Sequence, residues 1–338
     1  MCESLQRSAG QRWIRCAILV AASTGYTGCG GPDGATPVVG PAPAAAASPE
    51  LYGAGLFSTG ARDLFIAFSP DQHRVLLSRG DQKLESFEIF ESRLDNAGHW
   101  SPPVKPRFAR GWSTADPHVA PDGRTVFFLS DRPNPGETAV RPTHDIWSAS
   151  LGADGEWGEA THLPATINDP DRDEWCPAVA ANGNLYFSAD RPGTHGGTDL
   201  WVARMVDGVY QTPENLGDAI NTEAHEFEAW IAPDESYLLF SALHRAGGLG
   251  GYDLFFSRRR DGRWEPARPI TAVNTEASEY NESVSPDGKW LYFSSTRQFH
   301  GVIGERFDYP RNEAAITGIG NGNDDVYRVS MVAIGLGL

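Results

Sequence analysis

Carboxyl side chains recur along this chain at intervals of just over fifty residues, and their type and spacing suit acid and base chemistry. Glu174, Glu226 and Glu279 stand at equivalent places in three similar segments, and Asp116 stands two residues further along in an earlier segment. Paired carboxyl groups act as the acid and the base or nucleophile in glycoside hydrolysis. If the chain is an enzyme, these four acids are therefore its candidate catalytic residues.

The same places can be followed through all the similar segments by counting back from a position that is usually proline. Seven residues before it stand Asp63, Thr114, Glu174, Glu226 and Glu279. Five residues before it stand Phe65, Asp116, Cys176, Glu228 and Asn281. Like charges gathered together raise each other's pKa, which is typical of a site for a cation, a basic partner or acid–base work. The candidate binding residues here are Glu174, Glu226, Glu228, Glu279 and Asn281. The alternative is structural, with the glutamates capping neighbouring backbone amides.

These positions belong to an internal repeat. One unit is written five times, as "FSPDQHRVLLSR" from Phe68, "VAPDGRTVFFLSDR" from Val119, "VAANGNLYFSADR" from Val179, "IAPDESYLLFSALHR" from Ile231 and "VSPDGKWLYFSSTR" from Val284. An apolar segment leads into a Pro-Asp-Gly-like turn and then into a β-branched and aromatic run, which predicts a β-hairpin. A third strand and a more polar fourth strand follow. Four short strands per repeat are typical of a β-propeller blade.

Five units predict an all-β, five-bladed propeller of four-stranded antiparallel blades, with six blades as the less favoured alternative. The fifth unit has no fourth strand after "DDVYRVSM". The segment from Leu51 has the layout of a fourth strand that leads into a first strand. We therefore expect residues 51–60 to pair with the last blade and close the ring, which leaves no open sheet edge.

A residue that recurs in every blade suits building the blade better than binding one ligand. In each unit an arginine ends the second strand and an acid begins the third. These two ends are adjacent across a hairpin, so we predict structural ion pairs between them. The predicted pairs include Arg132 with Asp145, Arg191 with Asp199, Arg245 with Asp253, and Arg297 with Asp325.

The repeat also resembles a known family. The stretch "INTEAHEFEAWIAPDESYLLFSALHRAGGLGGYDLF" is similar to the WD40-like PD40 repeat of bacterial envelope proteins, which is related to the propeller of the Tol-system periplasmic protein. The resemblance covers about residues 51–331. It implies the propeller fold and a binding role in the cell envelope, and it names no partner.

The beginning of the chain has the pattern of an export signal. Basic residues precede the short apolar core "CAILVAAS", and "YTGC", which ends at Cys29, resembles a bacterial lipobox. We predict a signal peptide over 1–28, a lipid on Cys29, a Gly/Pro/Ala-rich tether over 29–50 and the propeller over 51–338. The protein is then exported and anchored by lipid, facing the periplasm or the cell surface. Plain secretion is the alternative.

Charge and motif content narrow the classes of partner. The formal net charge is −16, and an acidic surface repels phosphate backbones, so we expect no nucleic-acid partner. The sequence has no GxSxG, phosphate-binding loop, dinucleotide fingerprint or CxxC motif. The acidic stretch "NDPDRDEW" lacks the glycine and the distal glutamate of a calcium loop. We expect no metal and no cofactor.

The repeat is most strongly broken between Arg297 and Asp325. Long insertions between repeated strands are where individual function tends to lie. The candidate binding residues in this insertion are Phe299, His300, Phe307, Tyr309 and Arg311, whose aromatic and cationic groups suit a peptide or a glycan.

Two functions fit these observations. The favoured one is a non-enzymatic envelope scaffold that engages a protein or a cell-wall glycan at a propeller face. The alternative is a carbohydrate-active enzyme, since five-bladed propellers also host glycosidases with carboxylates at the mouth of the channel.

Overall fold

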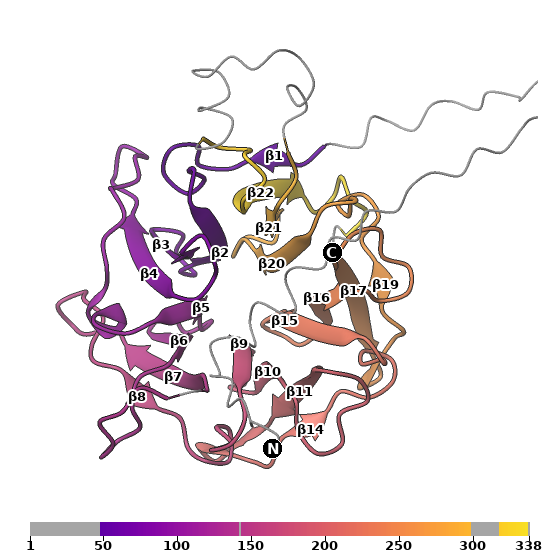
Figure 1. The fold of residues 1–338 in the computed structure, drawn as a ribbon, viewed down its shortest axis with the longest axis horizontal. Helices are drawn as coiled ribbons and strands as arrows, with labels where there is room; N and C mark the ends of the chain where they lie inside the picture. The colour runs from indigo at the N-terminus through magenta and orange to yellow at the C-terminus, as the bar shows by residue number, and fades with distance from the viewer. Residues whose placement is uncertain (1–47, 142, 299–317, 337–338) are drawn as a thin grey trace, which may run out of the picture.

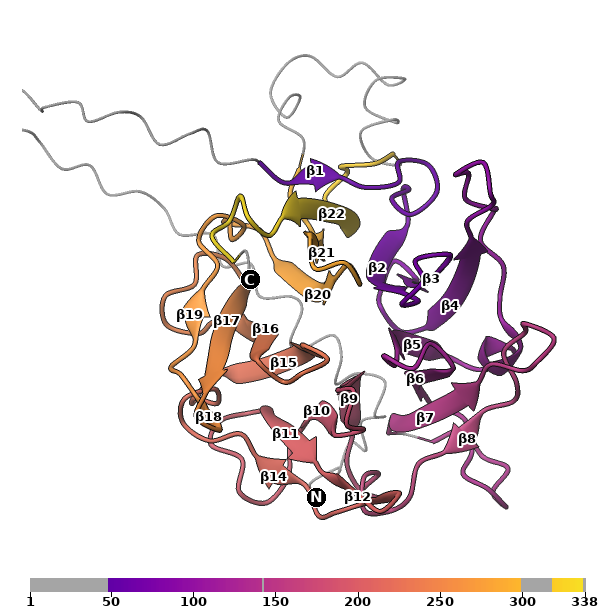
Figure 2. The same ribbon diagram turned by 180° about the vertical axis from the view of Figure 1, so that it is seen from behind.

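The computed structural model describes residues 48–141, 143–298 and 318–336. These residues form five antiparallel sheets arranged as blades around a central axis (Figures 1 and 2). The predicted five-bladed all-β propeller is therefore confirmed, and the six-bladed alternative is not. The expected signal peptide and Cys29 lie outside the described residues, as does most of the expected tether. In the part of the chain that the structure describes, no helix has the length and apolar character needed to cross a membrane.

Each blade runs from an inner strand beside the axis to an outer strand at the rim. Blade one consists of β2 (Arg62–Phe68), β3 (Arg74–Gly80) and β4 (Phe87–Arg93), with a single bridge from Glu91 to Val104 at its outer edge. A short 3₁₀ turn, η1 (Arg107–Ala109), leads on to blade two. Blade two consists of β5 (Thr114–Val119), β6 (Thr125–Ser130), β7 (Asp145–Ser150) and β8 (Thr161–His162).

Blade three consists of β9 (Glu174–Val179), β10 (Leu185–Ala189), β11 (Asp199–Ala203) and β14 (Glu214–Asn215), with the small hairpin β12 (Met205–Val206) and β13 (Val209–Tyr210) beside it. Blade four consists of β15 (His225–Ile231), β16 (Tyr237–Leu243), β17 (Tyr252–Arg260) and β19 (Arg268–Pro269), and β18 (Arg263–Trp264) pairs with the end of β17. Blade five consists of β20 (Glu279–Val284), β21 (Trp290–Ser295), β22 (Asp325–Ser330) and β1 (Glu50–Leu51).

The N-terminal strand closes the ring. β1 pairs antiparallel with β22, with Glu50 opposite Arg328 and Leu51 opposite Tyr327. This is the expected closure, although the strand begins one residue earlier and is only two residues long. The Ser58 hydroxyl donates to the carbonyl of Val326 and extends the attachment beyond the strand.

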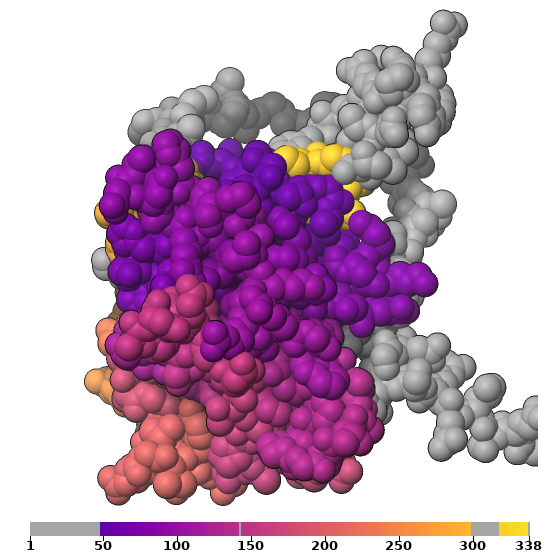
Figure 3. Space-filling view, turned by 90° about the vertical axis from the view of Figure 1, so that its left-hand side faces the viewer, coloured from indigo at the N-terminus to yellow at the C-terminus, as the bar shows by residue number. Residues whose placement is uncertain are grey.

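The hydrophobic core lies between neighbouring blades. Phe240 and Phe255 of blade four are buried together with Leu200 and Tyr186 of blade three, and similar clusters fill the other contacts between blades. Burial of a large aromatic side chain contributes about 2–3 kcal/mol. Because each sheet packs against two neighbours, the ring holds its inner strands in fixed positions around the axis. From the side, the outer edges of blades one and two form one continuous surface (Figure 3).

Candidate active site

Each inner strand contains one β-bulge, and the bulge sets which side chains are turned toward the channel. Pairing with the second strand slips in every blade: between Leu64 and Ile66 in β2, for example, and between Phe227 and Trp230 in β15. The bulged residues adopt left-handed backbone angles, with φ from 22° to 59°, and they are Phe65, Asp116, Cys176, Glu228 and Asn281. A non-glycine residue in this region costs on the order of 1 kcal/mol, and bulges re-aim side chains near functional sites. The predicted position five residues before the proline is therefore the bulge itself.

The bulged residues contact one another across the blades. The Cys176 thiol of blade three donates to Asp116 Oδ2 of blade two at 3.3 Å. The Asn281 backbone amide of blade five donates to Glu228 Oε2 of blade four at 2.8 Å, and the Ser241 hydroxyl donates to the same oxygen at 2.7 Å. The structure thus brings Asp116, Glu228 and Asn281, which the sequence singled out, to the same level of the channel.

A third carboxyl group, which the sequence analysis missed, belongs to the same level. Glu282 follows the bulged Asn281, its residue is only 1% exposed, and neither of its oxygens has a hydrogen-bond partner among the described residues. Its charge would interact with that of Glu228. A signal for it exists in the sequence, because the equivalent residues in the other blades are Ile66, Pro117, Pro177 and Ala229. An acid at a position that is otherwise apolar marks a departure from the repeat.

Burial separates the protonation states of these acids. Burial raises the pKa of Asp116 to about 6 and that of Glu228 to about 8. Burial, with the nearby charge of Glu228, raises the pKa of Glu282 well above its usual range. At neutral pH Asp116 is therefore mostly ionised while Glu228 mostly holds its proton. Acid–base catalysis needs one protonated and one ionised group at the same pH, and acids with well-separated pKa values provide this arrangement.

A small hollow lies in the channel just beyond the bulges. Its volume is about 40 Å³, and Glu282, His118 and Trp230 are among the residues of all five inner strands that line it. His118 Nε2 accepts the backbone amide of Val179 at 3.0 Å, and burial lowers the pKa of His118 to about 4, so its ring is neutral. A hollow of this size has room for water and not for a sugar ring.

Aromatic side chains gather on the other side of the bulges, at the mouth where the inner strands begin. Trp175 and Phe227 lie edge to face at 5.9 Å, Phe227 and Tyr252 lie edge to face at 6.1 Å, and the Tyr252 and Tyr280 rings are 5.5 Å apart. All four are partly exposed. Trp175, Phe227 and Tyr280 each stand one residue before a bulge, so these rings border the level of the carboxyl groups. We call these four residues the aromatic arc.

The three glutamates that the sequence offered as catalytic or binding residues occupy a different environment. Glu174, Glu226 and Glu279 are fully buried at the beginning of β9, β15 and β20. Arg191, Arg245 and Arg297 pair with them, in that order, at 2.7, 3.1 and 3.1 Å. Backbone amides of Asp169, Thr222 and Thr275 donate to the same three carboxylates. Each guanidinium also donates to a backbone carbonyl, of Ile167, Ile220 or Val273. These contacts are those of the structural alternative, and we call each set a knot.

The predicted arginine pairs with the third-strand acids are wrong. Among the described residues no ion pair joins Arg132 to Asp145, Arg191 to Asp199, Arg245 to Asp253, or Arg297 to Asp325. The third-strand acids instead bind groups of their own loops: Asp253 accepts the amides of Leu249 and Gly250, Asp199 that of His195, and Asp325 that of Gly320, while Asp145 contacts His162. In each of these aspartates the other oxygen, Oδ1, has no hydrogen-bond partner among the described residues. In blades three, four and five the arginine pairs with the first-strand glutamate instead.

Blade two is the exception that shows what the knot requires. Thr114 takes the place of the glutamate there, and Arg132 binds the Ser130 hydroxyl and the Phe108 carbonyl instead of a carboxylate. Burial without an acidic partner lowers the pKa of Arg132 to about 10. The guanidinium lies 5.0 Å from the centre of the Trp147 ring, which compensates part of its lost hydration.

The candidate binding residues of the insertion, Phe299, His300, Phe307, Tyr309 and Arg311, lie outside the described residues. Within the described ranges, no group of three or more His, Cys, Asp or Glu side chains is arranged to hold a metal ion.

Comparison with known proteins adds information on the fold. No family model matches the chain, and no curated protein matches it. Similar solved structures include the complex of BT0996 with RGII, at 12% identity and a TM-score of 0.50, which covers 83% of this protein and 90% of that one. Another is CoXyl43, a GH43 β-xylosidase/α-arabinofuranosidase from a compost microbial metagenome in complex with xylotriose, at 10% identity, a TM-score of 0.48 and coverage of 83% and 94%. A third is the α-L-arabinofuranosidase from Lactobacillus brevis, at 11% identity, a TM-score of 0.45 and coverage of 82% and 92%.

These comparisons contradict the favoured function. We expected a non-enzymatic envelope scaffold and leaned against an enzyme, yet the neighbours in fold include proteins named as glycoside hydrolases. At 12% identity and a TM-score of 0.50, the likeness to the BT0996 complex shows only that the fold is shared. We therefore withdraw the prediction of a scaffold function and infer an activity from the residues of the channel itself.

Proposed function

We propose that this protein is a carbohydrate-active enzyme, a glycoside hydrolase that uses acids of the propeller channel. One observation carries the proposal: Asp116, Glu228 and Glu282 come from three different blades, stand at one level of the channel, and have no arginine or lysine partner among the described residues. Their lack of a cationic partner supports these acids over Glu174, Glu226 and Glu279, whose carboxylates are engaged in knots.

The surroundings suggest a role for each acid. Glu228 has a pKa of about 8 and accepts both of its hydrogen bonds at Oε2, so Oε1 is left to hold the proton. It is suited to protonate the leaving oxygen of a glycosidic bond. Asp116, with a pKa of about 6, is ionised at neutral pH and suited to act as the base or nucleophile. Burial and the nearby charge of Glu228 raise the pKa of Glu282 and so favour its neutral form beside the acid.

The aromatic arc supports a sugar as the substrate. Trp175, Phe227, Tyr252 and Tyr280 offer partly exposed ring surfaces beside these acids. The C–H faces of pyranose and furanose rings stack on such surfaces, while the sugar hydroxyls remain free for polar contacts.

Hydrolysis of a glycan panel tests the proposal. Purified protein is incubated with neutral and acidic polysaccharides, and new reducing ends are measured for the wild type, Glu228→Gln and the matched control Glu223→Gln. Glu223 is an exposed glutamate of the same blade. We expect cleavage by the wild type and the control, and its loss in Glu228→Gln. Absence of cleavage on the whole panel, or equal cleavage by Glu228→Gln, would overturn the proposal.

The pH dependence gives a second, independent measurement. The proposed mechanism needs Asp116 ionised and Glu228 protonated, so the profile of kcat/KM is expected to be bell-shaped, with limbs near 6 and 8. Activity falls below the acidic limb because Asp116 gains a proton, and falls above the alkaline limb because Glu228 loses one.

We also propose the setting in which the enzyme works. The repeat resembles the PD40 family, and the signal-like segment ending at Cys29 supports an exported lipoprotein held at the membrane by its lipid. A glycan of the envelope or its surroundings is then the partner. In a bacterial host, Cys29→Ala is expected to move the protein from the membrane to the soluble fraction and abolish labelling by a palmitate analogue. Unchanged labelling would contradict the anchor.

A further inference from the structure

The outer part of blade four carries a run of arginines on a strongly acidic protein. Arg258, Arg259 and Arg260 end β17, and Arg263 and Arg268 follow within the next few residues. The chain as a whole has a formal charge of −16. A cluster of arginines on such an acidic protein requires an explanation. Either the arginines have a structural role or they bind a ligand.

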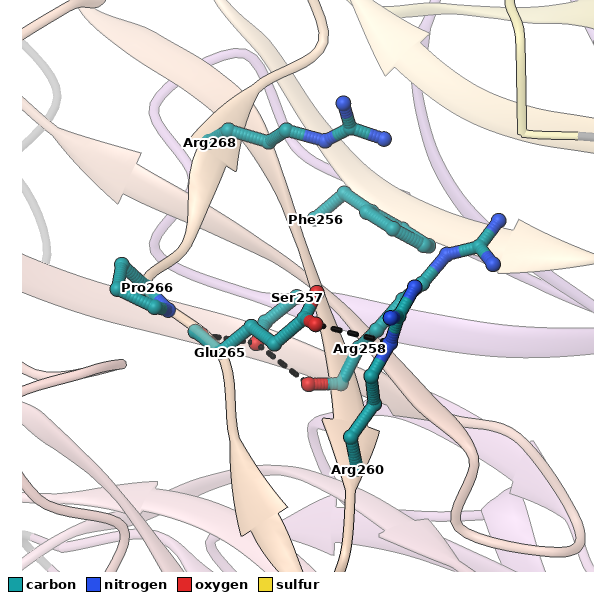
Figure 4. A pocket seen from close by; sticks show the side chains of 7 residues that line it. All are labelled: Phe256, Ser257, Arg258, Arg260, Glu265, Pro266 and Arg268. Carbon is teal, nitrogen blue, oxygen red and sulfur yellow. Dashed lines mark hydrogen bonds and ion pairs between the residues drawn. The ribbon is translucent and has the colours of Figure 1, made fainter.

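Strand register places some of these cations on one face. Side chains alternate along a strand, so Phe256, Arg258 and Arg260 share a face of β17. Arg268 of β19 is directly opposite Phe256 in the ladder. Figure 4 shows the Arg258 and Arg268 side chains on either side of the Phe256 ring. These residues, with Ser257, Glu265 and Pro266, line a hollow of about 270 Å³.

Some arginines of this run form ion pairs with acids, and others have no acidic partner among the described residues. Arg260 pairs with Glu265 at 2.9 Å, and Arg259 pairs with Glu235 at 2.8 Å. Neither Arg258 nor Arg268 has an acidic partner among the described residues. Their guanidinium groups lie against the Phe256 ring, at 5.7 and 5.5 Å from its centre. The hollow is therefore bordered by two positive charges that no acid of the described chain compensates.

Two free guanidinium groups on either side of the Phe256 ring suit an anionic ligand that carries more than one carboxylate. Each guanidinium presents parallel N–H donors that match the two oxygens of a carboxylate. The rest of the acidic surface repels anions, so an anionic ligand is directed to this place. Pro266 adds an apolar wall, and a hollow of this size is close to the lower end for small-ligand pockets, about 300 Å³.

We propose that this hollow is a binding site for the carboxylates of an acidic glycan, carried by neighbouring uronate units, at the rim of blade four and separate from the channel. The choice of a sugar as the bearer of the carboxylate rests on the proposed function. The binding itself requires only Arg258 and Arg268.

Calorimetric titration with trigalacturonate tests the site, with xylotriose as the neutral probe and inorganic phosphate as the alternative anion. The protein carries Asp116→Asn so that no hydrolysis interferes. The double variant Arg258→Gln/Arg268→Gln is compared with Arg263→Gln, which removes an exposed arginine of the same hairpin that does not line the hollow. Thermal unfolding of each variant checks that the blade is intact.

We expect trigalacturonate to bind to the protein. Its affinity is expected to be roughly 30-fold lower in the double variant and to change by less than about twofold in Arg263→Gln. Xylotriose is expected not to bind at the rim. Unchanged trigalacturonate affinity in a folded double variant would overturn the site, and phosphate binding as tight as trigalacturonate would overturn its assignment to a sugar carboxylate. If the wild type hydrolyses no glycan while the arginine-dependent binding is observed, the proposed activity fails and the binding site stands.

Discussion

Two sets of acids on the inner strands have opposite surroundings, and in blades four and five a member of each set lies on the same strand, two or three residues apart. Glu174, Glu226 and Glu279 begin their strands in knots with an arginine and backbone amides. Asp116, Glu228 and Glu282 lie at or beside the bulges and have no cationic partner among the described residues. Burial raises the pKa of members of both sets, but only in the knots does a guanidinium oppose that rise.

The difference in surroundings depends on whether the acid recurs at the same position of the repeat. Acids that recur from blade to blade stabilise the blade, since each one satisfies the amides and the arginine of its own corner. The channel acids occur at positions where the other blades have phenylalanine, cysteine, asparagine, proline, isoleucine or alanine. A buried carboxyl group without compensation is destabilising, so its presence at a position that the fold can fill with apolar residues points to function.

The largest expected effect separates the two sets by activity. Asp116→Asn and Glu228→Gln are expected to lower kcat by about a thousandfold with little change in thermal stability, because each removes one proton-transfer group. Glu226→Gln is expected to retain most of its kcat per folded molecule while unfolding more readily. Steady-state kinetics combined with circular dichroism melting measures both. A Glu226→Gln variant that is stable and inactive would reverse the assignment.

The next effect concerns the knots, and blade two provides the matched control. Arg245→Met leaves Glu226 buried without its cation, so we expect a loss of about 3–5 kcal/mol in the free energy of unfolding. Arg132→Met removes an arginine that has no acidic partner, and the expected loss is about 1–2 kcal/mol. Chemical denaturation compares the two variants. Equal losses would show that the ion pair adds nothing to the knot.

A smaller effect is expected in the pH dependence of stability. The pKa of Glu282 is higher in the folded state than in the unfolded chain, so the folded protein binds its proton more tightly. Stability from this group is present below the unfolded pKa and is lost as the pH rises through the folded pKa. The stability of Glu282→Gln relative to the wild type is therefore expected to be greater at pH 9 than at pH 5. Denaturation at both pH values measures this, and a difference that does not change with pH would contradict it.

The smallest expected effect concerns the thiol beside Asp116. The Cys176 thiol donates to the Asp116 carboxylate and favours its ionised form. Cys176→Ala removes that donor, so the acidic limb of the pH–activity profile is expected to move upward by less than about one pH unit. A limb that does not move, in a variant of normal stability, would show that the thiol has no influence on the base.

The sequence predicts the ring and much less of the site. Turns, strand periodicity and the repeat are local, so five blades and closure by the N-terminal strand follow from residue types and their spacing alone. The partner of Arg191 does not, because Glu174 and Asp199 both flank the end of β10 and both accept backbone amides, so residue types and spacing do not distinguish them. Asp116 and Glu228 stand out when the units are aligned. Glu282 was missed because its equivalents are apolar in every other blade, so the position has the pattern of core packing.

Ring closure has a consequence for the order in which this protein can be completed. The segment that holds Glu50 and Leu51 is synthesised before all the other described strands, yet its only strand partner, β22, is the last one made. Blade five therefore stays a two-stranded sheet of β20 and β21 until the chain around Tyr327 has emerged as β22. Until then β1 has no strand to pair with. The final folding step is then a long-range association between the two ends of the described chain, and slow closure or pairing between two copies is the form its misfolding would take.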